Sequence, residues 1–228
     1  SGYSYLLAYT LSRSKDTRSF DPAFTVVSTG AAQSASSTPF DIRNRALNYA
    51  LSDFDRTHVF QAQWVWELPF GRGKRWGGDA GAVANALIGG WQISGQMVVQ
   101  SGRPFTIYSG ANTLSNVVQT PANCTGCDGT EGAVYRETDG IVWYLTAEER
   151  AKFGIPDPGA FSNMGRNAFR GPGSFNMNLS IAKRIDTVNG QFLEIRGDAT
   201  NVTNTPTFGL PTATITSPIF GRIRDSVA

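Results

Sequence analysis

Five stretches of the chain alternate between apolar and polar residues with a period of two, which is the pattern of a half-buried β-strand. In FQAQWVWELPF, Trp64 and Trp66 share one parity, whereas Gln61 and Gln63 share the other. The same alternation predicts strands over residues 3–12, 60–70, 91–102, 175–184 and 193–202. We therefore expect an all-β, antiparallel fold.

The two parities indicate two different surroundings for the strands. The polar parity carries Gln, Asn, Ser, Glu, Arg and Asp, which favour water. On the apolar parity, several stretches have an aromatic residue near one end: Tyr3, Phe70, Trp91 and Phe175. Aromatic residues in that place are typical of the interfacial girdles of membrane β-barrels, and a strand of about ten residues can cross a bilayer at a tilt. The pattern favours transmembrane strands.

The connections between these strands alternate in length. Residues 14–55 and 105–173 form long connections, whereas residues 71–90 and 186–190 form shorter ones, the last with an Asn-Gly turn. Outer-membrane barrels have long external loops and short periplasmic turns. We therefore expect one barrel domain over residues 1–228, with external loops 14–55 and 105–173 and periplasmic turns 71–90 and 186–190.

Two short segments within the connections are candidates for helices. TAEERAKFG places Thr146 at a cap, Glu148 and Glu149 in the first turn, and Gly154 at a stop, which are the residue types that begin and end helices. DAGAVANALIGG, residues 79–90, fits either a short helix or a flexible turn.

Composition excludes several classes of protein. Hydrophobic residues make up 40% and charged residues 17% of the chain, both below the roughly 45–50% and 25% of soluble domains. An aromatic share of 11% argues against simple disorder. With a net charge of +2 and no basic stripe interleaved with aromatics, we expect no nucleic-acid partner.

The two cysteines form one C-x-x-C, Cys124 and Cys127 in NCTGCDGT. No βαβ pattern surrounds them, as a redox motif would require. A zinc site needs about four ligands, and the only histidine, His58, is far away in sequence. We predict a small disulfide in an exposed loop, which implies an oxidising compartment. An unpaired or mixed state is the alternative.

Several longer segments resemble TonB-dependent outer-membrane transporters, in particular the Oar-like group, which carries a carboxypeptidase-regulatory-like domain ahead of the plug. SDFDRTHVFQAQWVWELPFGRGKRW followed by GGWQISGQMVVQSGRPFTI carries the resemblance. GRNAFRGPGSFNMNLSIAKRI and LEIRGDATNVTNTPTFGLP resemble the last strands of the same group.

The resemblance implies a barrel of about 22 strands with a plugged lumen, in the outer membrane of a Gram-negative-type bacterium. It also implies energised import of an unknown extracellular ligand. The sequence has no plug and no TonB-contacting segment, and it stops at FGRIRDSVA, before the family's final strand. We expect it to be a C-terminal barrel portion of five to six strands. Its partners would be lipid, the rest of the barrel and plug, and the TonB complex through the missing N-terminal part.

Two sets of residues are candidates for the functional site. The first set would face the lumen, with a mutually paired wall network as the alternative: Gln63, Glu67, Glu194, Arg196 and Asp198. The second set would contact the ligand from the external loops, with packing of the loops on themselves as the alternative: Tyr108, Tyr135, Trp143 and Tyr144.

No catalytic constellation is apparent in the sequence. A single histidine argues against a Ser-His-Asp triad, and His58 is expected as an interfacial polar residue at a strand start. Asp53 and Asp55 in SDFDR could bind calcium, but a full site needs 6–8 oxygens. The alternative is pairing with Arg56 and capping of the loop. We expect no enzyme activity, no cofactor and no metal.

Two other classes of function remain open. The chain could be a secreted or surface β-rich fragment that self-associates through exposed strand edges. It could also be a soluble carbohydrate-binding or hydrolytic sandwich. The polar second face of every strand and the missing catalytic set argue against the soluble sandwich.

Overall fold

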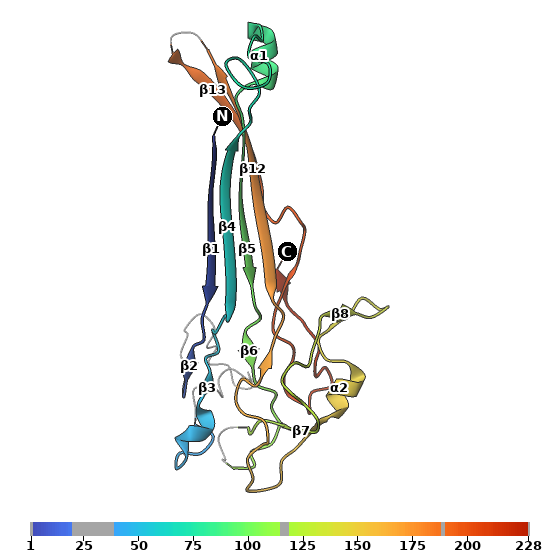
Figure 1. The fold of residues 1–228 in the computed structure, drawn as a ribbon. Coiled ribbons are helices and arrows are strands. Elements are labelled where there is room, and N and C mark those ends of the chain that lie inside the picture. The colour runs from blue at the N-terminus through green and yellow to red at the C-terminus, as the bar shows by residue number, and fades with distance from the viewer. Residues whose placement is uncertain (1, 20–38, 115–118, 188–189, 228) are drawn as a thin grey trace.

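A long antiparallel sheet of five strands runs through the computed structural model, which describes residues 2–19, 39–114, 119–187 and 190–227 (Figure 1). Its strand order is β1-β4-β5-β12-β13, so that each long strand pairs with the long strand before it in sequence. The strands are β1 (Tyr3–Leu11), β4 (His58–Glu67), β5 (Trp91–Gln100), β12 (Ser174–Asp186) and β13 (Phe192–Ala199). The predicted all-β, antiparallel fold class is confirmed.

The strand ends differ slightly from the alternation in the sequence. β4 begins two residues earlier than predicted and ends at Glu67. Pro69, which has no backbone N–H to donate, follows shortly after this end. Phe70 therefore lies outside the strand, where its ring packs at a tilt against that of Trp76 with centroids 5.2 Å apart. The aromatic expected at this strand end thus packs within the connection.

The register places residues of like polarity beside one another at most positions of the five strands, although Leu6 is the partner of Gln63. One row of partners consists only of uncharged, mostly apolar residues: Tyr5, Trp64, Gly95, Leu179 and Ala199. The adjacent row contains the amides of Gln63, Gln96 and Asn178. Because side chains alternate between faces, every pairing is in phase and the sheet has one apolar face and one polar face.

Gly95 allows an indole ring to cover the middle of the apolar face. A Cβ atom at Gly95 would lie 2.2 Å from Cζ2 of Trp64 and 2.8 Å from Cδ2 of Leu179. The Trp64 ring therefore lies directly over the backbone of the neighbouring strand. Close cover of a strand glycine by an aromatic neighbour is a known means of pinning the register of a sheet.

Two polar side chains on the apolar face both lie at its ends. His58, the first residue of β4, has its Nδ1 atom 2.7 Å from the hydroxyl of Tyr9. At the opposite end Lys183 is paired in register with Trp91, and its ammonium group donates to the carbonyl of Gly89. The middle of the apolar face thus carries no charge.

The two long connections lie at one end of the sheet and the two shorter ones at the other, as Figure 1 shows. The shorter ones contain α1 (Ala82–Ile88) and the turn closed by the Thr187 N–H bond to the Gln191 carbonyl. Asn189 of the predicted Asn-Gly turn lies outside the described residues. For residues 79–90 the helix, rather than the flexible turn, is the correct alternative.

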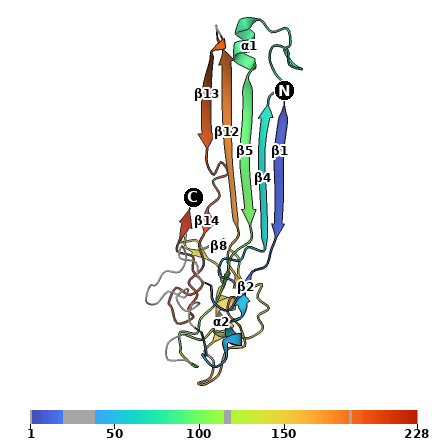
Figure 2. The same ribbon diagram turned by 90° about the vertical axis from the view of Figure 1, so that its left-hand side faces the viewer.

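The long connections and the C-terminal segment form what we call the loop body: the described residues of 12–57, 101–173 and 200–225. Its short strands form two-stranded sheets. One of these, β14 with β15, lies beside the long sheet. Its elements, with β14 and β15, are β2 (Lys15–Asp16), η2 (Arg45–Asn48), β3 (Ala50–Leu51), β6 (Pro104–Phe105), β7 (Asn123–Cys124), β8 (Tyr135–Arg136), β9 (Val142–Trp143), α2 (Ala147–Ala151), β10 (Phe153–Gly154), β11 (Phe169–Arg170), β14 (Thr207–Phe208) and β15 (Ser226–Val227). Figure 2 shows the sheet and the loop body from the side.

α2 confirms the predicted cap. The Glu149 N–H donates to Oγ1 of Thr146 at 3.1 Å, and the Thr146 N–H donates to Oε2 of Glu149 at 2.7 Å, which completes a capping box. The helix ends at Ala151, before the predicted stop, because Phe153 and Gly154 pair with β7 instead.

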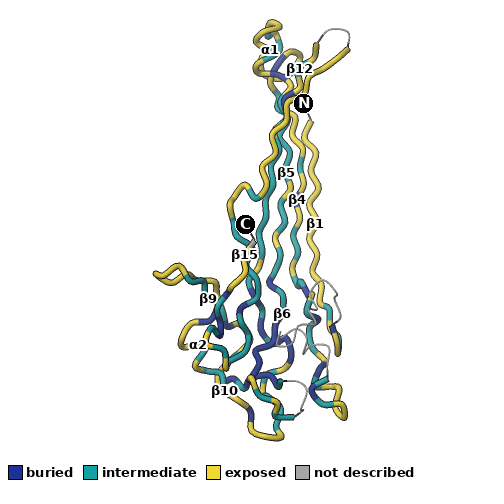
Figure 3. The backbone as a smooth tube through the Cα atoms, turned by 180° about the vertical axis from the view of Figure 1, so that it is seen from behind, coloured by how far each residue is buried: buried dark blue, intermediate teal, exposed yellow. Residues whose placement is uncertain are grey.

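The main hydrophobic core lies in the loop body and not against the sheet, as the dark blue segments of Figure 3 show. Its buried members are Phe105, Ile107, Ala122, Tyr144, Leu145, Phe169, Phe220 and Ile223. By contrast, every residue of β1 and of β13 is exposed, apolar ones included. In the described ranges, no helix is both long and apolar enough to cross a membrane.

We predict that Gly95→Ala destabilises the sheet, whereas Gly197→Ala does not. A methyl group at Gly95 would collide with Trp64, and overpacking of this kind costs about 1–3 kcal/mol. A Cβ at Gly197, on the same face, would meet only Cγ2 of Ile181 at 3.8 Å, an ordinary contact. Urea unfolding of the lipid-refolded protein, followed by tryptophan fluorescence, measures both variants. Equal unfolding midpoints would show that Trp64 does not cover Gly95.

Candidate functional site

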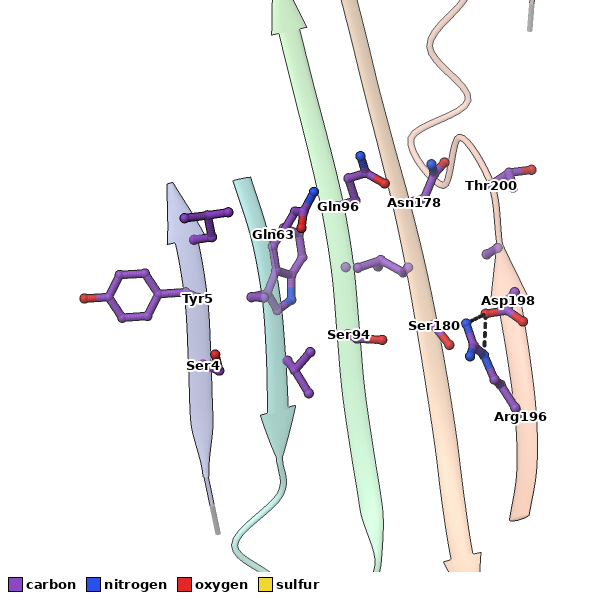
Figure 4. A pocket seen from close by; sticks show the side chains of 16 residues that line it. Ser4, Tyr5, Gln63, Ser94, Gln96, Asn178, Ser180, Arg196, Asp198 and Thr200 are labelled. Atoms are coloured by element: carbon purple, nitrogen blue, oxygen red, sulfur yellow. Dashed lines mark hydrogen bonds and ion pairs between the residues drawn. The ribbon is translucent and has the colours of Figure 1, made fainter. Parts of the chain in front are cut away.

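The residues predicted to face the lumen lie together on the polar face of the sheet. Gln63 is level with Gln96 and Asn178, whereas Asp198 is level with Ser94 and Ser180 (Figure 4). Glu67, Glu194 and Arg196 share the parity of this face. A hollow of about 520 Å³ opens on the face, and residues of all five strands line it. The register thus joins residues that are far apart in sequence.

Four charged residues on this face form two ion pairs, and Gln63, Gln96 and Asn178 beside them carry no charge. The Arg196 guanidinium is 2.9 Å from the Asp198 carboxylate on the same strand. Arg184 and Asp186 form a similar pair at 2.9 Å. This pairing agrees with the alternative of a mutually paired wall network. These pairs are exposed, and such pairs contribute only about 0–1 kcal/mol.

Of the four aromatic residues predicted to contact a ligand, Tyr108 and Tyr144 are buried. They are 2% and 6% exposed, and burial raises the pKa of both hydroxyl groups. Tyr144 belongs to the main core and donates to the Arg170 carbonyl at 2.6 Å. Both residues therefore pack within the loop body, in agreement with the alternative that the loops pack on themselves.

Tyr135 and Trp143 lie nearer the surface. They are register partners on β8 and β9, and both are half-buried. The Tyr135 hydroxyl donates to the Leu145 carbonyl at 3.1 Å. Ligand contact by these two residues remains a prediction.

A fully buried arginine connects the two long connections of the loop body. The Nε atom of Arg166 donates to the Asn48 carbonyl at 3.0 Å, and Nη1 lies 3.4 Å from Oδ1 of Asp53. Nη2 pairs with the Asp16 carboxylate. The neighbouring Asn167 donates to Asp53 at 2.6 Å. Residues more than one hundred positions apart are therefore held at one point.

Arg170 makes a second connection next to the sheet. It lies 2.8 Å from Oδ2 of Asp55, which also accepts a bond from the Thr57 hydroxyl at 3.0 Å. The alternative of pairing with Arg56 is wrong for Asp55, which pairs with Arg170, whereas the Arg56 guanidinium donates to the Ser101 carbonyl at 2.7 Å. Burial by itself would raise the pKa of Asp55, but the bonds from Arg170, the Ser14 N–H and Thr57 together lower it.

These contacts show which groups bind the carboxylates of Asp53 and Asp55. Arginine and amide groups occupy the carboxylates that were considered for calcium. Among the described residues, no group of three or more His, Cys, Asp or Glu side chains is placed to hold a metal ion. Arg166 and Arg170 were not among the candidate residues, because nothing in GRNAFRGPG indicates which carboxylates they meet.

The predicted disulfide between Cys124 and Cys127 is present. Cys124 lies on β7, where it pairs with Phe153 of β10, and its N–H donates to the Asn163 side chain at 2.9 Å. The disulfide thus belongs to the packed part of the loop body, and Cys124 is only 4% exposed. The expectation of an exposed loop applies only to the segment just after β7.

Comparison with known proteins places the chain in one family. A family model described as "Outer membrane beta barrel domain" matches residues 1–228. No curated protein and no solved structure matches the chain. The match includes both the five-stranded sheet and the loop body.

We predict that Arg166→Met loosens the loop body and leaves the sheet intact. The substitution leaves the partly buried carboxylates of Asp16 and Asp53 without their cation, and breaking such a pair costs about 3–5 kcal/mol. Arg43→Met is the matched control, because the Arg43 side chain is 86% exposed beside Asp41. Limited proteolysis of the folded protein should cut the loop body of Arg166→Met only. Wild-type resistance in that variant would refute the connecting role.

A second prediction concerns acid. The Asp16 and Asp55 carboxylates have pKa values below the 3.8 of the unfolded chain. Their stabilising contribution is therefore complete above that value and is lost as the pH falls through the lower folded pKa values. Hydrogen exchange, corrected for its intrinsic pH dependence, should show the loop body loosening below about pH 4. Asp55→Asn should be less stable at neutral pH and less sensitive to acid, and unchanged acid sensitivity would contradict the assignment.

Proposed function

The chain belongs to the outer membrane β-barrel domain family, and from this membership we propose the C-terminal barrel portion of a TonB-dependent transporter of the Oar-like group. A barrel of this family lies in the outer membrane and contacts its lipid. The proposed activity is capture of an extracellular ligand by the loop body and its import through the barrel. TonB in the inner membrane would supply the energy.

The observation that carries this proposal is the opposite polarity of the two sheet faces. Apolar residues are exposed along the strands, while the packed core lies elsewhere, in the loop body. In water such a face would aggregate or find a partner. In a bilayer it faces hydrocarbon, and the polar face is then directed toward the barrel interior.

The edges of the sheet support a larger barrel. Among the described residues, β1 and β13 each pair with one strand of this sheet only. Each presents a row of backbone N–H and C=O groups, and every unpaired group in hydrocarbon costs several kcal/mol. Further strands that continue the sheet from both edges would satisfy these groups.

The polar face supports a filled barrel interior. Gln63, Gln96 and Asn178 offer amides without net charge, and Arg196 is neutralised by Asp198. A wall rich in uncharged hydrogen-bonding groups suits contact with a folded plug, because such groups can form hydrogen bonds across the interface. The loop body suits ligand capture, because its packed core holds the surface groups in place.

The test begins with the intact protein extracted from its native outer membrane in detergent. We expect anomalous migration on unheated gels, a mass far above 24.6 kDa, and retention on the immobilised periplasmic domain of TonB. Binding should require the folded protein, so a heat-unfolded sample serves as the control. A porin extracted in parallel controls for retention of any outer-membrane barrel.

The possible outcomes separate the rival functions. A heat-modifiable barrel that TonB does not retain would refute the transporter and leave the family assignment unchanged. A water-soluble species of 24.6 kDa that self-associates would favour the surface fragment that joins its neighbours through strand edges.

A further inference from the structure

Three buried N–H donors in the loop body have no hydrogen-bond partner in the described part of the chain. They are Nε1 of Trp143, Nη1 of Arg150 and Nε of Arg222. A buried donor without an acceptor costs about 1–3 kcal/mol. Such groups are rare in native proteins, and an ion that supplies the acceptor is one recognised explanation.

The three side chains come from separate segments and meet at one place. Trp143 on β9 forms an isolated antiparallel bridge with Arg222 of the C-terminal segment. Hydrogen bonds of 2.8 Å from Tyr144 to Gly221 and 2.9 Å from Ile223 to Val142 flank this bridge. Trp143 and Arg222 are therefore a non-hydrogen-bonded pair, the type whose side chains lie closest together on one face.

Arg150 completes the group from α2. Its guanidinium carbon lies 3.9 Å from the centroid of the Trp143 ring. The Thr146 capping box fixes the start of this helix, and the Arg150 side chain extends to Gly221, whose Cβ position would be 3.2 Å from Arg150 Cδ. The Arg150 guanidinium thus lies on the Trp143 indole, and Arg222 is the bridge partner of the same tryptophan.

No carboxylate of the described residues forms an ion pair with either arginine, and the nearby acids are bound elsewhere. Glu149 accepts bonds from the Thr146 and Gly132 N–H groups at 2.7 and 3.1 Å. Glu131 accepts from the Asp128 and Gly129 N–H groups, and Lys152 lies 3.9 Å from it. Within the described ranges, the Arg150 and Arg222 guanidinium groups therefore have no carboxylate as an ion-pair partner.

We propose that Trp143, Arg150 and Arg222 form a binding site for an oxyanion, a carboxylate or phosphate group of a soluble ligand. The site offers donors only, which excludes a metal ion and favours an acceptor-rich anion. Planar guanidinium groups match carboxylate and phosphate oxygens in charge and geometry. All three residues are half-buried as a whole, so part of each lies at the surface near the buried donor atoms.

The location relates this site to ligand capture. Trp143 and its register partner Tyr135 lie on the hairpin of β8 and β9, which projects from the loop body in Figure 1, and Figure 3 shows the exposed tip of that hairpin. If the loop body captures the imported ligand, as proposed above, that ligand carries an acidic group. This last step rests on the proposed function, whereas anion binding itself does not.

Isothermal titration of the intact protein in an uncharged maltoside detergent tests the site with inorganic phosphate and with citrate. We expect saturable binding of at least one of them and none of glucose. Arg150→Gln and Arg222→Gln should each weaken binding at least tenfold. Trp143→Phe keeps an aromatic ring but removes the N–H group, and should weaken binding about threefold to tenfold. Arg43→Gln, the exposed loop-body control, should bind as the wild type does.

Thermal unfolding provides an independent reading that does not depend on TonB or on transport. The anion should raise the Tm of the wild type and of Arg43→Gln, but not of Arg222→Gln. Absence of binding by both anions, or equal affinity in all variants, would overturn the site and leave the transporter proposal standing. Binding only of lipopolysaccharide phosphates, in a parallel titration, would overturn the assignment to a soluble ligand.

Discussion

The phase of the strand pairing is the constraint on which the rest of this protein depends. Side chains alternate strictly along a strand, so a slip of one residue in any pairing would move all the apolar side chains of the displaced strand to the polar face. The four pairings that join the five long strands are all in phase. The cover of Gly95 by Trp64 shows one way in which this register is held, because the ring fits only opposite a residue without a side chain.

The sheet and the loop body are stabilised by different physical means. The strands carry their apolar residues outward and have little core of their own, so that backbone hydrogen bonds and the surrounding hydrocarbon stabilise them. The loop body has an aromatic core and two buried or half-buried arginines that bind carboxylates from the other long connection. These arginines join the two long connections at the end of the sheet where both begin and end.

The same packing has left three donors without acceptors in one place. Other buried polar groups of the loop body have partners: Arg166 forms ion pairs with two carboxylates, and Asn167 donates hydrogen bonds to Asp53 and to the Leu51 carbonyl. Against that background, Trp143, Arg150 and Arg222 stand out as a group. An oxyanion would complete a pattern of bonding that the rest of the loop body already follows.

The sequence by itself determined the five strands, the capped helix at Thr146, the disulfide and the grouping of the long connections at one end. These features depend on local alternation, on capping residues or on short spacing, all of which can be read along the chain. Only the tertiary structure decided that Asp55 meets Arg170 rather than Arg56, that Tyr108 and Tyr144 are buried, and that Arg222 lies beside Trp143. Each of these joins residues far apart in sequence through irregular loops, where no periodicity specifies which side chains meet.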